Sequence, residues 1–269
     1  MDTAVILARG LGTRMRQEDP EAALNPEQEE IASTGVKALI PIQRPFLDYV
    51  LTALADAGYH RVGLVVGPEH QALREYYGET LAYTRLEVGF AIQERPLGTA
   101  DAVAAAERFV AGEPFLMVNS DNYYPVEALQ SLRGLGGPGL AVFVRDSMLR
   151  HSNIPAERLR QFAVVEVDAQ GYMRRIVEKP DPQVLASLPE PVGVSMNCWR
   201  FDQRIFAACR AIGPSPRGEL EITDAVQHAI DHLGVRFRAL PFEAAVLDLS
   251  SRSDVGPVSR FLAEVTVRL

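Results

Sequence analysis

The sequence predicts an α/β fold, a Rossmann-like three-layer α/β/α arrangement with a mostly parallel, mixed sheet. Short apolar runs that read as buried strands alternate with helical patterns through most of the 269 residues. Several runs, such as 62–66 and 115–118, are apolar at nearly every position, as expected for strands covered on both faces. We therefore expect residues 1–269 to form a single domain that buries a sizeable core.

The elements are expected in a regular order along the chain. Short, mostly apolar runs bounded by turn residues predict strands at 4–7, 62–66, 87–91, 115–119, 140–144, 163–167, 174–177, 194–200 and 237–241. Apolar residues recurring three and four positions apart predict helices at 45–57, 70–77, 100–110, 126–133, 202–211, 223–233 and 254–264. The acidic stretch 16–36 predicts either a mobile or helical lid or a solvated surface excursion.

Composition narrows the class of protein. The net charge of -8 argues against a nucleic-acid partner, which would need a basic face. Only two cysteines are present, Cys198 and Cys209, so a disulfide framework is not expected. This cysteine content predicts a protein of a reducing compartment. A core strand begins directly after Met1, and no apolar run reaches membrane-spanning length. These features predict a cytoplasmic protein without a membrane partner.

The first strand leads into a glycine-rich turn that suits a phosphate group. Gly10 and Gly12 let the backbone bend and approach a ligand whose phosphates need free N–H groups, and Arg14 and Lys37 would add positive charge. An ordinary strand-to-helix turn is the alternative. Position 15 is Met, so the dinucleotide fingerprint does not fit, and the chain has no Gly-Lys triplet of a P-loop.

Two aspartates are candidates for binding a divalent cation. Asp121 follows the predicted strand 115–119, and a cation bound to phosphates usually takes one or two protein carboxylates. Asp121 as a turn residue or as the cap of the helix near residue 126 remains an alternative. Asp248 precedes the last predicted helix, where it is either a second carboxylate or a turn residue, with Asp254 as the helix cap.

The turn Gly-Leu-Gly-Thr-Arg at 10–14 resembles the signature loop of the sugar-1-phosphate nucleotidyltransferases. Further segments resemble motifs of that family in the family's order: Gln93 with the Leu-Gly-Thr-Ala of 97–100, the strand end at Asp121, Glu-Lys-Pro at 178–180 and Asp248. The stretch 217–224, Arg-Gly-Glu-Leu-Glu-Ile-Thr-Asp, resembles the form in glucose-1-phosphate thymidylyltransferases. The resemblance extends from residue 4 to about residue 255 and implies a fold of the nucleotide-diphospho-sugar transferase type.

The resemblance implies a role for each matched residue. The loop residues would wrap the triphosphate of a nucleotide, and these are Ala8, Gly10, Gly12 and Thr13. Arg14 and Lys37 would bind the pyrophosphate, while Gln93 would read the base. Gly98 and Thr99 would pack close to the base, where a side chain at position 98 would obstruct it.

The remaining matches concern the sugar and the metal. Glu178 would contact sugar hydroxyls, Lys179 the sugar phosphate, and Asn197 would line the far wall of the sugar pocket. Asp121 and Asp248 would hold Mg²⁺, with Mn²⁺ as an alternative. Arg14, Lys37, Asp121 and Lys179 are the expected catalytic residues.

The implied reaction joins a nucleoside triphosphate to a sugar-1-phosphate. An oxygen of the sugar phosphate attacks the α-phosphorus, pyrophosphate leaves and a nucleotide sugar forms. Such a transfer depends on positioning and charge neutralisation and needs no side-chain nucleophile. Relatives with an appended β-helical acetyltransferase domain carry out a second step, and this chain is expected to lack that domain.

Three departures from the family pattern leave alternatives open. Arg9 stands where Ala or Gly is usual and could add a phosphate contact or obstruct the site; Ala38 replaces Pro, and Phe162-Ala163 replaces Tyr-Gly. One alternative is therefore a regulatory homologue that binds a nucleotide sugar without turnover. Another is a CTP-dependent transferase for a sugar-acid or polyol phosphate, which leaves 217–224 unexplained. The base, the sugar and the choice between monomer and homo-oligomer are not predicted.

Overall fold

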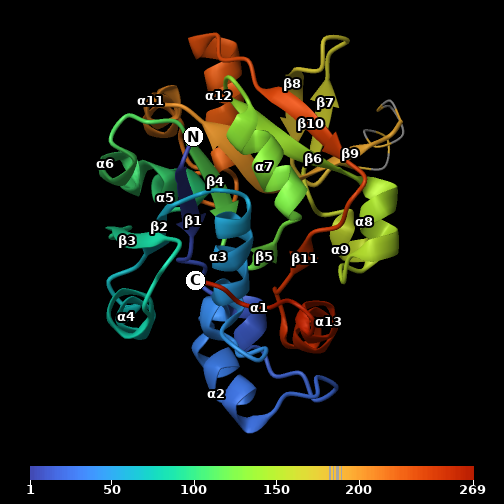
Figure 1. The fold of residues 1–269 in the computed structure, drawn as a ribbon. Coiled ribbons are helices and arrows are strands. Elements are labelled where there is room, and N and C mark those ends of the chain that lie inside the picture. The colour runs from blue at the N-terminus through green and yellow to red at the C-terminus, as the bar shows by residue number, and fades with distance from the viewer. Residues whose placement is uncertain (182, 184, 186–187, 189) are drawn as a thin grey trace.

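The computed structural model describes residues 1–181, 183, 185, 188 and 190–269, and among these a nine-stranded sheet forms the middle layer (Figure 1). The strand order is β10-β6-β9-β4-β1-β2-β3, and β7 pairs with β9 and β8 beside this path. Within the described part of the path, every strand except β9 has the same direction. The expected mostly parallel, mixed sheet is confirmed.

The strands begin and end within one residue of the predicted bounds. They are β1 Thr3–Leu7, β2 Arg61–Val66, β3 Glu87–Ile92, β4 Phe115–Asn119, β6 Gly139–Val144, β7 Val164–Val167, β8 Met173–Val177, β9 Gly193–Phe201 and β10 Arg238–Phe242. A separate antiparallel pair, β5 Asn122–Tyr123 and β11 Leu247–Asp248, was not predicted. This short pair matters for the site because it joins the residues after β4 to those before the last helix.

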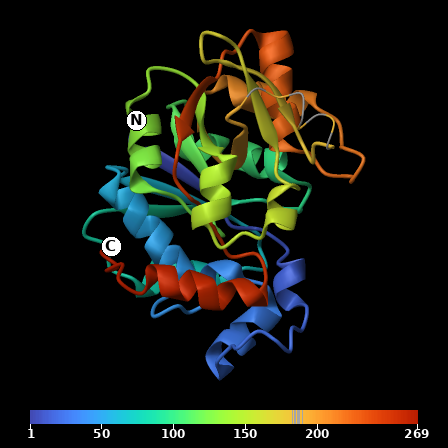
Figure 2. The same cartoon turned by 90° about the vertical axis from the view of Figure 1, so that its right-hand side faces the viewer.

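Helices cover both faces of the sheet, which confirms the three layers (Figure 2). One core contains side chains of α3 Phe46–Asp56, α4 Gln71–Glu75, α7 Val126–Gly134 and α13 Arg252–Leu262. The other contains side chains of α5 Thr99–Ala105, α6 Glu107–Val110, α11 Arg204–Ala211 and α12 Ile222–Leu233. None of the described helices is long and apolar enough to cross a membrane.

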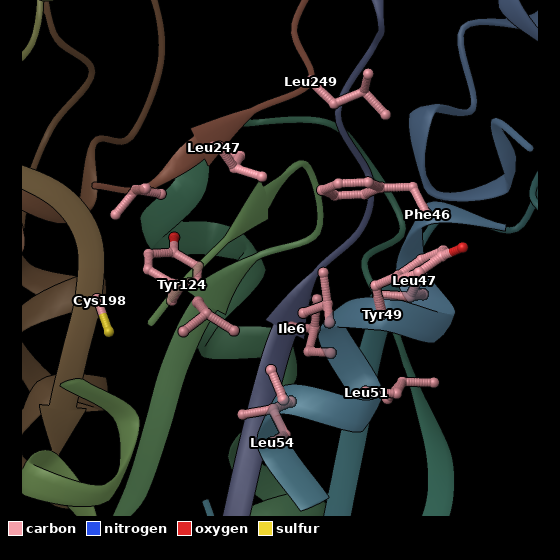
Figure 3. Packing of buried hydrophobic residues seen from close by; sticks show 14 of the residues in the cluster. Ile6, Phe46, Leu47, Tyr49, Leu51, Leu54, Tyr124, Cys198, Leu247 and Leu249 are labelled. Carbon is pink, nitrogen blue, oxygen red and sulfur yellow. The ribbon is translucent and has the colours of Figure 1, made fainter. Parts of the chain in front are cut away.

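The central strand β1 shows how the sequence produces this arrangement. Successive side chains of a strand point to opposite faces, so Ala4 and Ile6 enter one core and Val5 and Leu7 the other. Ile6 lies beside Leu51 and Leu54 of α3 (Figure 3). All five residues of β1 are buried, and each large aliphatic side chain buried in this way contributes about 1.5–3 kcal/mol. Burial therefore holds the strand end that leads into the Gly10 turn.

Some helical predictions were wrong in their extent. The helix expected at 100–110 is broken at Ala106, whose amide bonds to the carbonyl of Val103 rather than continuing the α-helical ladder. The helix expected at 70–77 becomes α4 followed by a π-helical turn, Tyr76–Thr80. Two short helices, α8 Arg145–His151 and α9 Ala156–Leu159, were not predicted.

The acidic stretch 16–36 contains a helix, α2 Pro26–Thr34, which follows the short α1 Thr13–Arg16. Asn25 and Gln28 form a reciprocal capping box at its start, and Gly35 ends it in a left-handed conformation. Arg252 of α13 links the segment to the opposite end of the chain, because its Nε donates to the carbonyl of Met15 and its Nη1 contacts Glu29. Figure 2 shows α13 in red beside these blue segments.

Candidate active site

A cavity of about 380 Å³ lies at the carboxyl ends of β1, β3 and β4. This is where parallel α/β sheets bind ligands. Its lining residues are Leu7, Arg9, Gly10, Leu11, Gly12, Thr13, Arg14, Lys37, Gln93, Pro96, Gly98, Thr99, Ala102, Asn119, Ser120, Asp121, Glu219 and Ser250. The fold therefore gathers nine of the residues expected to bind nucleotide or metal around one cavity: Gly10, Gly12, Thr13, Arg14, Lys37, Gln93, Gly98, Thr99 and Asp121.

The glycine turn has one position that requires glycine and one that does not. Gly12 has a φ of 61°, and a Cβ there would lie 2.1 Å from the carbonyl oxygen of Gly35. The turn is thus packed directly against the segment after α2. Nothing lies within 4 Å of a Cβ built on Gly10. Ala8 is buried behind the turn and is not part of the cavity lining.

Replacing each glycine by alanine separates these two positions. Gly12→Ala is expected to destabilise the protein by about 2 kcal/mol or more, because the new methyl group meets main-chain atoms at a positive φ. Gly10→Ala is the matched control and should leave the free energy of unfolding nearly unchanged. Urea denaturation of the two variants beside the wild type measures both values. Equal stability of the two variants would contradict this description of the turn.

Arg9 connects the ends of three neighbouring strands. Its Nε donates to Oε1 of Glu69 at 3.0 Å and its Nη2 to Oε2 at 3.1 Å, while its Nη1 donates to the main-chain carbonyl of Gln93. The side chain is only 7% exposed. Gly67 leaves room for this pair, since a Cβ there would lie 2.3 Å from the Glu69 carboxylate. The Arg9 guanidinium therefore binds protein groups at the edge of the cavity.

Lys37 and Asp121 both line the cavity and form an ion pair with each other. Lys37 lies on the single helical turn Lys37–Leu39, beside the buried Ala38, and its Nζ contacts Oδ2 of Asp121. No hydrogen bond from another described residue reaches Oδ1 of Asp121. Asp121 does not cap the following helix, because the N-cap of α7 is Pro125 without a side-chain bond. The capping alternative for Asp121 is therefore wrong.

Asp248 lies beside Asp121 but is buried and absent from the cavity lining. The amide of Leu249 donates to the carbonyl of Asp121 at 2.8 Å, which holds the two segments together. The Asp248 carboxylate accepts from Ser250 Oγ at 2.8 Å and from Asn122 Nδ2 at 3.0 Å. The pKa of Asp248 is raised to about 6, mainly because the carboxyl group is buried and secondly because the negative charge of Asp121 lies nearby.

Arg158 holds this acidic region in place. It forms two hydrogen bonds with Asp254, at 2.8 and 2.9 Å, and its Nη2 lies 3.3 Å from Oδ2 of Asp248. The expected cap at Asp254 is corrected: α13 begins at Arg252 with Ser251 as its N-cap, and Asp254 is the third helical residue, whose carboxylate completes a capping box with Ser251. Arg158 was not predicted, because its partners lie about ninety residues further along the chain and no local pattern points to them.

Gln93 is 3% exposed and its side-chain amide has two partners. Nε2 donates to the carbonyl of Gly98 at 3.1 Å and to Oδ2 of Asp101 at 2.7 Å. Asp101 was not expected to have a role in the site. Its place in the first turn of α5, within the Leu-Gly-Thr-Ala-Asp run, is the signal that could have found it.

The loop before α5 is joined to the segment 217–224. Thr99 is the first residue of α5, and its Oγ1 accepts from the amide of Ile222 at 2.8 Å. Gly98 has a φ of 124°, and a Cβ there would lie 2.5 Å from the carbonyl oxygen of Leu220. Packing against Leu220 thus requires glycine at position 98, independently of any contact with a base. The segment leads into α12, which begins at Ile222 after Glu221.

The residues expected to bind the sugar are not part of the cavity lining. Glu178 and Lys179 are exposed after β8, and Lys179 has a φ of 42°. Asn197 lies within β9 at a φ of 54°, and its Oδ1 accepts from Nε1 of Trp199 at 3.3 Å. Arg217 binds Glu221 with its Nη2 at 2.5 Å, and Glu219 of the same segment does line the cavity. These sugar contacts remain predictions.

Comparisons with known proteins agree with this geometry. A family model described as nucleotidyl transferase matches residues 3–264. The chain is 33% identical over 263 residues to a glucose-1-phosphate thymidylyltransferase of Streptomyces antibioticus, which covers 97% of this chain and 66% of the relative. It is 30% identical over 234 residues to a low-salt glycan biosynthesis nucleotidyltransferase of Haloferax volcanii, covering 84% of this chain and 57% of that protein. The chain thus spans less than two thirds of these relatives.

Solved structures share the fold at lower sequence identity. The structure of a UDP-glucose pyrophosphorylase complexed with UDP-glucose matches with a TM-score of 0.74 and 18% identity, and covers 99% of this chain and 100% of the other. A structure described as a glucose-1-phosphate thymidylyltransferase from Bacillus anthracis matches with a TM-score of 0.72 and 18% identity, covering 98% and 96%. Both matches extend over nearly the whole chain.

Proposed function

Because this chain belongs to the nucleotidyl transferase family, we propose that it transfers a nucleotidyl group from a nucleoside triphosphate to a sugar-1-phosphate and releases pyrophosphate. The observation that carries the proposal is the cavity at the strand ends, where the glycine turn, two basic side chains and a carboxylate meet. Gly10, Arg14, Lys37 and Asp121 all line it. A cavity of about 380 Å³ is within the usual range of small-molecule sites.

The proposed roles follow from the positions of the side chains. The turn from Gly10 to Gly12 leads into α1, which begins at Thr13; its main-chain amides would bind the phosphates, and Arg14 and Lys37 would neutralise the leaving pyrophosphate. Gln93 would bind the base. Lys179 would bind the sugar phosphate and Glu178 and Asn197 the sugar, on the basis of the family motif.

Asp121 and Asp248 fit a divalent cation. Their negative charges raise the pKa of Asp248 by mutual repulsion on top of burial, and Asp121 has an oxygen that no described residue binds. Two carboxylates are a suitable donor set for Mg²⁺ or Mn²⁺ that is also bound to substrate phosphates. When bound, the ion would offset the charge that develops on the phosphate oxygens. Arg158, Ser250 and Asn122 would keep the Asp248 carboxylate oriented.

The chain's own residues would act by orientation and charge. The cavity holds the nucleotide so that its α-phosphorus faces the sugar phosphate, whose oxygen attacks as the bond to pyrophosphate breaks. No side-chain nucleophile is required, since positioning and charge neutralisation supply the rate enhancement. The step needs no proton transfer from the protein, because the attacking sugar phosphate and the leaving pyrophosphate are both ionised.

A release assay tests the proposal. The protein is incubated with Mg²⁺, each of UTP, dTTP, GTP, CTP and ATP, and a panel of sugar-1-phosphates, and pyrophosphate is measured with a coupled pyrophosphatase. The proposal predicts release that requires both the nucleotide and one sugar-1-phosphate. Nucleotide binding without release in every combination would contradict it and would favour a sensor of nucleotide sugars.

Metal binding is expected to depend on pH. The folded pKa of Asp248, about 6, is above its ordinary value of 3.8, so the metal-free folded protein holds an extra proton between these values and loses stability as the pH rises through them. A metal ligand must be deprotonated, so Mg²⁺ affinity should rise by up to about tenfold per unit from about pH 5 to the pKa, and level off above it. Calorimetric titration at several pH values measures this. A Mg²⁺ affinity independent of pH would contradict the assignment of Asp248.

A further inference from the structure

The side-chain amide of Gln93 has only one possible orientation in the cavity. An amide nitrogen donates and an amide oxygen accepts, and both neighbours of this amide are acceptors: the carbonyl of Gly98 and a carboxylate oxygen of Asp101. Exchanging the nitrogen and oxygen would place the oxygen against both of them. The two partners therefore fix the nitrogen toward α5 and leave Oε1 on the opposite side.

Oε1 of Gln93 is an acceptor without a donor. No described residue donates a hydrogen bond to it, although Gln93 lines the cavity and is 3% exposed. It is also absent from the fully buried unpaired side-chain atoms of the described residues. The oxygen is thus accessible from the cavity, and a nearly buried acceptor in such a place requires a donor from the ligand.

The surrounding main chain is held as firmly as the side chain. Nη1 of Arg9 donates to the carbonyl of Gln93, and Glu69 binds the same guanidinium with two hydrogen bonds. Asp101 is the third residue of α5, so its carboxylate is held at the start of a helix. Neither the main chain nor the side-chain amide of Gln93 can rotate without breaking these bonds.

We propose that Asp101 is a positioning residue that turns the carbonyl oxygen of Gln93 toward the base, so that the site selects nucleobases carrying a ring N–H donor. This inference rests on the proposed function. Uracil and thymine present such an N–H at N3 and guanine at N1. Cytosine and adenine present a ring nitrogen with a lone pair at the same position, which would face the Gln93 oxygen without a hydrogen bond.

The comparison of UTP with CTP isolates this feature because the two bases have nearly the same size. A site that hydrogen-bonds one polar group rejects an analogue lacking it by large factors, since the buried group is left unpaired. For whichever of UTP, dTTP and GTP the protein uses, we expect kcat/KM to exceed that of the matched amino base, CTP or ATP, by at least about 100-fold. N3-methyl-UTP should be rejected like CTP.

The Asp101→Asn variant tests the positioning role. The side-chain amide that this change introduces can donate as well as accept, so it can pair with the Gln93 oxygen, and only the Gly98 carbonyl then still opposes the orientation with the Gln93 nitrogen toward the base. The ratio of kcat/KM for UTP over CTP should then fall by at least about tenfold, partly through a gain with CTP. Glu107→Gln is the control, because it removes one charge from the next helix at an ion pair with Arg210. Thermal unfolding checks that both variants are folded.

The outcomes distinguish this inference from the proposed function. Equal use of UTP and CTP by the wild type would overturn the inference and leave nucleotidyl transfer intact. An equal loss of activity with every nucleotide in Asp101→Asn would show a merely structural role and would also overturn it. If no nucleotide is turned over, the proposed function fails, and calorimetry then compares the binding of UTP with CTP and of GTP with ATP. Tighter binding of UTP or of GTP than of its amino counterpart supports the inference, and equal or absent binding in both pairs overturns it.

Discussion

The Asp121→Asn variant is expected to lose turnover by about a hundredfold to a thousandfold and to keep its fold. Asp121 lines the cavity, contacts Lys37 with one carboxylate oxygen and lies next to Asp248. Asparagine has the same shape but no charge, so it weakens the proposed metal site without changing the packing. The variant should also need a higher Mg²⁺ concentration for half-maximal rate. Steady-state kinetics at several Mg²⁺ concentrations measures both effects.

A matched control distinguishes a local effect from the loss of a charge. Asp146→Asn makes the same chemical change at an exposed position in the first turn of α8, away from the cavity lining. It should keep the wild-type rate. Near-full activity of Asp121→Asn at saturating Mg²⁺, with the wild-type melting temperature, would contradict the role given to Asp121.

The Lys37→Met variant is expected to lose about a hundredfold in kcat/KM for the nucleotide. The Lys37 side chain is 14% exposed, so its charge acts in a partly desolvated place close to the expected pyrophosphate. Methionine keeps the aliphatic stem and removes the ammonium group. Because Lys37 also offsets the charge of Asp121, its loss should leave Mg²⁺ affinity unchanged or stronger.

The direction of the Mg²⁺ effect separates the two variants. Asp121→Asn should weaken Mg²⁺ binding in calorimetry, whereas Lys37→Met should not. Arg150→Met, which removes an exposed charge in the last turn of α8, is the control and should have no effect on either value. Weaker Mg²⁺ binding by Lys37→Met would contradict the view that this lysine opposes the positive ion.

The sheet was predictable from local patterns because its strands are buried. Consecutive apolar residues such as those of β1 and β4 leave little choice of element, and the strand bounds agree within one residue. The short helices α8 and α9 were missed because four to seven residues are too few for a helical period to emerge. For α2, the signal was present in the Asn25-Pro26 start and in Gly35.

The site was predictable where a motif stands at the end of a strand and not where it depends on distant partners. Gly10, Gln93 and Asp121 follow β1, β3 and β4, so the topology alone brings them together. The contact between Arg158 and Asp248 depends on the tertiary fold, and no local pattern indicates it. Gly98 lines the cavity, so its expected packing near a base stays a prediction, while its packing on Leu220, which also requires glycine, was not predicted.

The most direct test of nucleotidyl transfer follows the phosphorus atoms through one reaction. Phosphorus NMR of the protein with Mg²⁺, a nucleoside triphosphate and its matching sugar-1-phosphate should show the sugar phosphate resonance replaced by the two coupled resonances of a nucleotide sugar. Pyrophosphate should appear in equal amount. A nucleoside monophosphate with an unchanged sugar phosphate, or an unchanged mixture in which the nucleotide is bound, would contradict the proposed function.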